Sequence, residues 1–174
     1  MVDVGTSGVR ASVVRPDASV TATHYRRALP TSPSPGLVEF DPLALTEAAL
    51  GVARAALAEG GPVAAVGIAN QRASTIVWDR ATGEPVGPGL GWQDLRTVGD
   101  CLVWQAEGLH FAPNESATKA AHLLDAADPE RHRDLCVGTV DTWLAWQLSG
   151  GELHVTDLSN AAITGLTLPE GSDW

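Results

Sequence analysis

Polar and apolar residues alternate through the first part of the chain. The stretches Val9 to Arg15 and Val20 to Ala28 are rich in valine and threonine, and Pro16-Asp17-Ala18 separates them. Alternation of this kind gives each stretch one apolar face, and proline and aspartate favour a turn. The pattern therefore predicts two strands joined as a hairpin, followed by a proline-rich loop from Pro30 to Phe40.

A helix is predicted after this loop. Asp41 can act as an N-cap, and Pro42 suits the first helical position. The apolar residues that follow recur with a helical period until Gly60-Gly61, which can end the helix. They are Leu43, Leu45, Ala49, Val52, Ala56 and Leu57. Pro62 to Ile68 is short and almost wholly apolar, which predicts a strand covered on both faces, as in a parallel sheet.

Strands and helices also alternate in the rest of the chain. We expect strands at Thr75 to Asp79 and Val86 to Trp92, around the turn Ala81-Thr82-Gly83. A helix of about ten residues should follow and stop near Gly108. Two more helices are expected, Ala117 to Ala127 capped by Ser116, and one capped by Thr139 that runs into Gly150-Gly151. Trp143, Leu144 and Trp146 are expected in the core. The alternation predicts an α/β fold.

Composition narrows the class of partner. The chain has 174 residues, of which 44% are apolar and 18% charged, and its formal net charge is −10. An acidic protein of this kind repels nucleic acid and anionic membrane surfaces, so small molecules are the expected partners. Its apolar runs are too short for a membrane span. Two cysteines, Cys101 and Cys136, are expected as reduced core thiols, which favours a cytoplasmic location.

The stretch Asp3 to Arg10 has the chemistry of a phosphate-binding hairpin. Gly5 lets the backbone approach an anion, the hydroxyls of Thr6 and Ser7 can donate to phosphate oxygens, and Asp3 can hold a divalent cation. An ordinary β-turn is the alternative, because Gly, Ser and Asp are common turn residues.

Two polar clusters follow predicted strands, at the position where open α/β sheets bind ligands. They are Ala69 to Ser74 and Trp92 to Thr97. Arg72 could instead satisfy a strand-end carbonyl or pair with Asp94. Further along the chain, Asp157 and Asn160 favour the cap of a local turn over a ligand role, and Asp141 favours compensation of a helix dipole over a role as a base.

Six blocks of the sequence together resemble the N-terminal domain of the FGGY family of carbohydrate kinases. They are Asp3 to Ser7, Gly67 to Arg72 with Thr75 to Asp79, Trp92 to Thr97, Ser116 to Lys119, Gly138 to Leu144 and His154 to Ala161. The resemblance implies the actin, Hsp70 and hexokinase type of fold, which is ribonuclease H-like with a mixed sheet flanked by helices. It also implies transfer of the γ-phosphoryl group of ATP to a hydroxyl of a sugar or polyol.

The resemblance assigns roles to particular residues. Asp3 corresponds to the aspartate that organises Mg²⁺, and Gly5, Thr6, Ser7 and Arg10 correspond to residues around the ATP phosphates. Gln71, Arg72, Trp92 and Asn114 correspond to residues that face the sugar. Family members that phosphorylate glycerol have a glutamate after the arginine and a tyrosine after a proline, whereas this chain has Ala73 and Asn114. Loss of the carboxylate weakens glycerol binding, so we expect a pentulose or a polyol other than glycerol.

The resemblance also sets expectations for the extent of the chain. In the family, the general-base aspartate and the adenosine pocket lie beyond the position of Trp174. We therefore expect residues 1–174 to form a single N-terminal domain, without catalysis by the chain alone, that pairs with a C-terminal kinase half or with itself. A non-catalytic module that binds a carbohydrate or a protein partner is the alternative. Only Met1 and Val2 precede Asp3, so we expect a partial first strand and a poorly anchored hairpin.

Overall fold

The computed structural model describes residues 1–167, which divide into two compact units. The first unit contains residues 1–30 and 41–71, and the second contains residues 31–40 and 72 onward. Each unit is built around its own four-stranded sheet. The end of the predicted domain, residues 168–174, lies outside the described residues.

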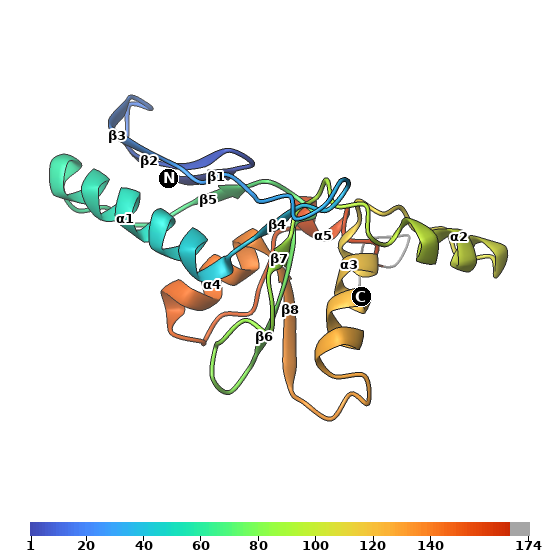
Figure 1. Cartoon of the computed structure of the whole chain (residues 1–174). Coiled ribbons are helices and arrows are strands. Elements are labelled where there is room, and N and C mark those ends of the chain that lie inside the picture. The colour runs from blue at the N-terminus through green and yellow to red at the C-terminus, as the bar shows by residue number, and fades with distance from the viewer. Residues whose placement is uncertain (168–174) are drawn as a thin grey trace. The chain divides into compact units, whose positions relative to one another are not determined.

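The first unit is a mixed sheet with one covering helix. Its strands are β1 (Val2–Gly5), β2 (Gly8–Val14), β3 (Val20–Arg27) and β5 (Ile68–Asn70), in the order β3-β2-β1-β5. The strands β1, β2 and β3 pair antiparallel, and β5 pairs parallel to β1. Helix α1 (Pro42–Gly60) packs along β2 and β3 (Figure 1). The predicted hairpin is therefore confirmed, and it continues into a sheet.

Helix α1 begins and ends where the sequence predicts. Asp41 accepts hydrogen bonds from the backbone N–H groups of Leu43 and Ala44, and Gly61 is the C-cap. The buried stripe faces the sheet, whereas Leu43 and Leu57 at its margins are exposed. A broad apolar stripe thus predicts the buried face of α1 correctly, except at its two edges.

Two expectations for the first unit are wrong. The predicted strand Pro62 to Ile68 forms only from Ile68 onward, and Val66 is 54% exposed. The physical reason is that β5 is an edge strand among residues 1–167, so an apolar run here has a described neighbour on one side only. The short first strand is also well anchored, because β1 pairs with β2 on one side and with β5 on the other.

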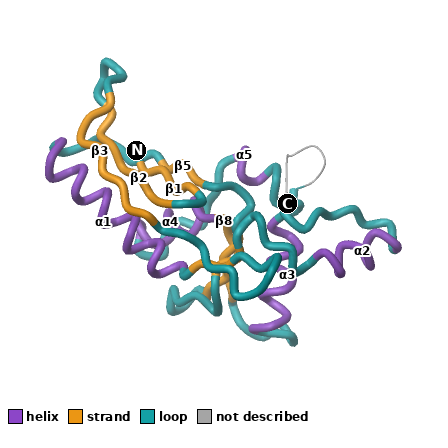
Figure 2. Tube along the Cα trace, turned by 45° about the horizontal axis from the view of Figure 1, so that its top comes forward, coloured by secondary structure: helices purple, strands orange, loops and turns teal. Residues whose placement is uncertain are grey.

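The second unit is an antiparallel sheet covered on both faces by helices. Its strands are β4 (Glu39–Phe40), β6 (Thr75–Asp79), β7 (Gly89–Leu90) and β8 (Leu135–Thr139), in the order β4-β7-β6-β8. Its helices are α2 (Val98–Ala106), α3 (Ser116–Ala127), α4 (Val140–Ser149) and α5 (Leu158–Ala161), shown in purple in Figure 2. The expected strand Val86 to Trp92 is therefore reduced to β7.

Alternate residues of β6 pack against different helices. Val77 contacts Leu123 of α3, whereas Trp78 packs against Trp143 and Trp146 of α4, with ring centroids 5.3 and 5.8 Å apart. Successive strand residues point to opposite faces of a sheet, so α3 and α4 lie on opposite sides of β6. The predicted core positions on α4 are confirmed, and the free cysteines Cys101 and Cys136 are buried as expected.

Two predicted helix caps use their hydroxyls differently. Ser116 is the first residue of α3, not its cap, and its hydroxyl donates to the carbonyl of Ala73. Thr139 does stand at the N-cap of α4, but its hydroxyl donates to the Asp141 carboxylate. In both cases a nearby acceptor outside the helix backbone takes the hydrogen bond.

Throughout residues 1–167, no helix has the length and apolar character that a membrane crossing requires.

The end of α1 provides a test of packing in the first unit. A Cβ atom added at Gly60 would lie 2.5 Å from Val13 Cγ2 and 3.1 Å from Ala22 Cβ. We expect Gly60→Ala to lower the free energy of unfolding by about 1–3 kcal/mol, because the helix must move away from the sheet. Urea denaturation measures the change.

Gly51→Ala is the matched control on the same helix. A Cβ atom there would come no closer than 3.9 Å to Arg26 Nη1. This variant should gain stability, by up to about 1 kcal/mol, because alanine favours a helix more than glycine does. Equal effects of the two substitutions would contradict the packing described here.

Candidate functional site

The turn between β1 and β2 carries the residues predicted to bind phosphate. Gly5 pairs with Gly8, so Thr6 and Ser7 form a two-residue turn. Asp3 lies directly opposite Arg10 in the antiparallel pair, and opposed residues project their side chains from the same face. The alternate residues Val4 and Val9 are fully buried, so Asp3 and Arg10 lie on the opposite, more open face.

Gln71 joins this face from the neighbouring strand. Its backbone N–H donates to the Val4 carbonyl at 2.7 Å, which extends the pairing of β5 with β1. Ala69 pairs with Asp3, and Gln71 follows two residues later, so it returns to the face of Asp3. The first unit thus brings together the residues Asp3, Gly5, Thr6, Ser7, Arg10 and Gln71.

Contacts from β3 fix the Thr6-Ser7 turn. The carbonyl of Ser7 accepts hydrogen bonds from the Tyr25 hydroxyl at 3.1 Å and from the Ala28 backbone N–H at 3.2 Å. Tyr25 can reach this carbonyl because Gly8 has no Cβ atom, which would collide with its ring. The sequence needs glycine at this position so that the tyrosine can hold the turn.

The remaining predicted substrate residues lie in the second unit. Ala73 adopts a left-handed backbone with φ +60°, although it is not glycine, and it is 4% exposed. Its carbonyl accepts from the Ser116 hydroxyl at 3.4 Å, and the next residue, Ser74, accepts from the Trp92 N–H at 3.1 Å. The segment Arg72 to Ser74 therefore contacts both the Trp92 loop and the start of α3. Strained backbone of this kind is concentrated at ligand sites.

The side chains of this second group are open to solvent. Arg72 and Asn114 are exposed, and Trp92 is 40% exposed. Asn114 lies two residues before Ser116, in the turn that precedes α3. The second unit thus brings the segments of Arg72, Trp92 and Asn114 together around Ala73.

A buried carboxylate holds the Trp92 loop. Asp94 is 0% exposed and accepts hydrogen bonds from the Val38 N–H at 2.6 Å, from the Arg96 N–H at 3.0 Å and from the Arg96 guanidinium at 2.8 and 2.9 Å. Arg96 also contacts Glu39 at 2.7 Å. Burial raises the pKa of Asp94, but the hydrogen bonds from Arg96 and Val38 outweigh it and keep the pKa below 3.8. The alternative that Asp94 pairs with Arg72 is wrong, because Arg96 takes that place.

Two other acidic residues have the structural placement that the sequence predicts. Asp157 caps α5 by accepting from the backbone N–H groups of Ser159 and Asn160, and hydrogen bonds from these residues lower its pKa to about 2. Asp141 lies in the first turn of α4 and accepts from the hydroxyls of Thr139 and Thr156.

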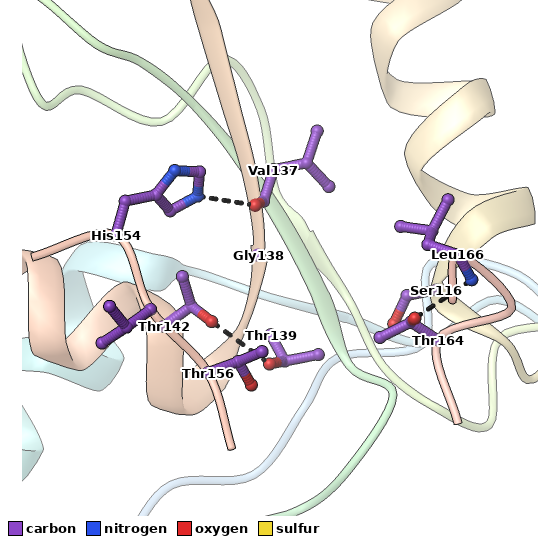
Figure 3. Close-up of a pocket in the computed structure, with 10 residues that line it drawn as sticks. Ser116, Val137, Gly138, Thr139, Thr142, His154, Thr156, Thr164 and Leu166 are labelled. Carbon is purple, nitrogen blue, oxygen red and sulfur yellow. Dashed lines mark hydrogen bonds between the residues drawn. The ribbon is translucent and has the colours of Figure 1, made fainter. Parts of the chain in front are cut away.

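A separate cavity of about 480 Å³ lies within the second unit (Figure 3). His154 Nε2 donates to the Val137 carbonyl at its wall, and Thr164 Oγ1 accepts from the Leu166 N–H. Its described lining includes none of the predicted site residues. It consists of Ser116, Val137, Gly138, Thr139, Thr142, His154, Val155, Thr156, Thr164 and Leu166.

Asp3 is the carboxylate that the sequence proposes for a metal. Among residues 1–167, no three His, Cys, Asp or Glu side chains gather where they could hold a metal ion by themselves. Mg²⁺ commonly takes only one or two protein carboxylates and completes its shell with substrate phosphates and water. A single carboxylate next to the Thr6-Ser7 turn fits that donor set.

Sequence reasoning missed the buried charges that support the site. Asp94 and Arg96 were predicted only as part of a polar cluster and Lys119 only as part of a motif, and the one partner offered, Arg72 for Asp94, is wrong. A signal was present for Lys119, which is the single lysine beside ten arginines. The long-range partners, Val38 for Asp94 and Glu39 for Arg96, could not be found, because each lies more than fifty positions away in the sequence.

Comparison with known proteins identifies relatives of the whole chain. Residues 1–174 match the FGGY family of carbohydrate kinases, N-terminal domain. Glycerol kinases from Ralstonia pickettii and Thermus brockianus are each 40% identical over 99% of this chain. The chain spans 38% of the length of each of these relatives.

Solved structures share the fold. The glycerol kinase of Plasmodium falciparum, determined with ADP, superposes with a TM-score of 0.89 at 22% identity, over 99% of this chain and 38% of that one. The xylulose kinase of Rhodospirillum rubrum superposes with a TM-score of 0.81 at 20% identity, over 99% of this chain and 38% of that one. The predicted α/β fold of the actin-like type, with a mixed sheet and flanking helices, is confirmed.

Removal of the buried carboxylate tests the support of the Trp92 loop. We expect Asp94→Ala to lower the free energy of unfolding by about 3–5 kcal/mol, because the largely buried Arg96 keeps Glu39 but loses Asp94 as a partner, and the Val38 N–H loses its acceptor. Urea denaturation at pH 7 measures the loss. Because the pKa of Asp94 is lowered, its contribution to the free energy of unfolding is present above pH 3.8 and declines as the pH falls further. The wild type and Asp94→Ala should therefore approach the same stability in acid.

Asp134→Ala is the matched control. Asp134 also pairs with an arginine, Arg80, but the two side chains are 73% and 43% exposed. Exposed pairs contribute less than about 1 kcal/mol, so this variant should remain close to the wild type. A loss for Asp94→Ala as small as that for Asp134→Ala would refute the role given to the buried pair.

Proposed function

Because the chain belongs to the FGGY family of carbohydrate kinases, we propose that it is the N-terminal, substrate-binding part of an ATP-dependent kinase. In this proposal the kinase transfers the γ-phosphoryl group of ATP to a hydroxyl of a pentulose, or of a polyol other than glycerol. The observation that carries the proposal is the shared face of Asp3, Arg10 and Gln71 beside the Thr6-Ser7 turn. Catalysis requires a C-terminal kinase half, which is the proposed partner.

The first unit holds the nucleotide side in this proposal. The hydroxyls of Thr6 and Ser7 donate to phosphate oxygens, and the Arg10 guanidinium supplies positive charge from the adjacent strand. Phosphoryl transfer depends mainly on positioning and on neutralising charge, so a turn fixed by Tyr25 is suited to the task. Asp3 would hold Mg²⁺, which when bound neutralises negative charge on the phosphates.

The second unit holds residues for the acceptor in this proposal. Trp92 offers an aromatic wall to the carbon skeleton, and Arg72 and Asn114 can hydrogen-bond its hydroxyls. Ala73 offers only a methyl group at the position where glycerol-specific members have a carboxylate. An acceptor larger than glycerol can bring its own polar groups to fill this space. The curated relatives are glycerol kinases, so glycerol is the comparison that the test must include.

Reconstitution tests the proposed reaction. The chain is co-expressed with the C-terminal half of an FGGY kinase, and ADP release is measured with glycerol, D-xylulose, D-ribulose and xylitol. We expect turnover with a ketose or xylitol at a higher kcat/KM than with glycerol. Saturable ketose binding without ADP release would instead support the non-catalytic binding module, and preference for glycerol over every other acceptor would refute the proposed specificity.

Substitution of Asp3 tests the nucleotide side in the reconstituted complex. We expect Asp3→Ala to lower kcat by at least about a hundredfold, because positioning of charge around the phosphates is lost. Asp17→Ala is the control, since Asp17 lies in the exposed turn between β2 and β3, where it accepts from the Ser19 N–H. Unchanged turnover in Asp3→Ala would rule out the role given to this carboxylate.

Substitution of Ala73 tests the acceptor side. Ala73→Glu should improve kcat/KM for glycerol by roughly tenfold to a hundredfold over Ala73→Gln, because a carboxylate accepts a hydroxyl hydrogen bond with about 1.5–3 kcal/mol. The pair of variants separates charge from size, and thermal unfolding checks that both fold. If both variants use glycerol equally well, the residue after Arg72 does not set acceptor choice.

A further inference from the structure

Lys119 is a lysine with no exposure to solvent. Its ammonium donates to three consecutive backbone carbonyls, those of Asn114 and Glu115 at 2.8 Å and that of Pro113 at 3.3 Å. An ammonium has three N–H donors, so all of them are used. The acceptors belong to the turn that carries Asn114, directly before α3.

This placement has an electrostatic cost. The side chain extends back toward the N-terminus of α3, where the helix dipole is positive and disfavours a cation. Burial lowers the pKa of Lys119 from 10.5 to about 8, and the nearby Asp94, Glu115 and Cys101 offset only part of that shift. A neutral side chain of similar length would avoid both costs. What offsets these costs is a set of three hydrogen bonds, all to the turn that carries Asn114.

The use that the geometry offers is control of the turn. The hydrogen bonds to residues 113 and 115 fix the backbone on both sides of Asn114, and so set the direction of its side chain. Glu115 adds a second restraint, because its carboxylate accepts from the Ala112 N–H at 3.0 Å. One residue further on, the Ser116 hydroxyl donates to Ala73. The clamp therefore links the position of Asn114 to the Arg72 segment.

We propose that Lys119 is a positioning residue whose ammonium holds residues 113–115 so that Asn114 faces the acceptor. This inference rests on the proposed function for the role of Asn114. It does not give Lys119 any contact with the acceptor or with ATP. When the ammonium loses a proton, it keeps two N–H donors and presents a lone pair to a carbonyl, so the clamp loosens.

Kinetics of the reconstituted kinase test the positioning role. We expect Lys119→Met to raise KM for the acceptor by about tenfold or more, because an unclamped turn must be ordered on binding, with a smaller change in kcat. Lys119→Arg should recover part of the loss, since it keeps a buried cation with several donors. His122→Ala is the control on α3, because His122 is exposed on the same helix. Unchanged KM in a folded Lys119→Met would overturn the proposal.

The pH dependence gives a test that needs no variant. Because the chain has a single lysine, ¹³C-lysine labelling gives one side-chain signal, whose inflection should lie near pH 8. We expect amide exchange in residues 114–116 to rise, relative to Val77, as this signal titrates. The lowered pKa means that the folded state releases its proton first, so this group makes folding more favourable as the pH rises from about 8 to 10.5. Deprotonation of Lys119 should therefore loosen the turn locally while it makes unfolding of the whole domain less favourable.

The two measurements separate failure of this inference from failure of the proposed function. If Lys119→Met does not fold, the wild-type acceptor KM should rise across the lysine inflection, and a flat KM refutes the positioning role. If the wild type turns over no acceptor, the proposed function fails. The amide-exchange experiment then decides whether Lys119 clamps the turn. Loss of protection in step with its titration supports the clamp, and constant protection overturns it.

Discussion

The second unit depends on the requirement that a buried charge must have partners. Asp94 and Lys119 are both fully buried, and each is satisfied mainly by groups that lie in loops. Asp94 fixes the loop that carries Trp92, and Lys119 fixes the turn that carries Asn114. Leaving either charge unpaired would be costly, so each charge restrains the loop that supplies its partners.

The first unit achieves its arrangement by strand register instead. The pairing of β1 with β2 and β5 puts Asp3, Arg10 and Gln71 on one face, because side chains alternate along a strand. The other face consists of valines that pack on α1. A slip of one residue would exchange the two faces, so packing of the valines against α1 also specifies the polar face. Core packing and the common face of Asp3, Arg10 and Gln71 are thus two results of one register.

Family membership and acceptor choice depend on different residues. The match to FGGY kinases extends over the whole chain, and the fold is shared with glycerol and xylulose kinases alike. Acceptor choice, in our proposal, depends on a few positions around Ala73. This alanine keeps a left-handed backbone without glycine. A strained position that presents only a methyl group is consistent with a site shaped by its substrate.

The sequence by itself determined the hairpin, the limits of α1 and the tryptophan core of α4, because these features follow from local periodicity and capping residues such as Asp41 and Gly61. It also predicted the Thr6-Ser7 turn, whose role in binding phosphate is part of our proposal. Only the tertiary structure decided that Pro62 to Gly67 stays exposed beside an edge strand, that Arg96 and not Arg72 pairs with Asp94, and that Lys119 is buried. Strand order and burial depend on residues far apart in the chain. Even the choice of Arg96 over Arg72 depends on how the Trp92 loop folds around Asp94, so no local pattern encodes which groups meet.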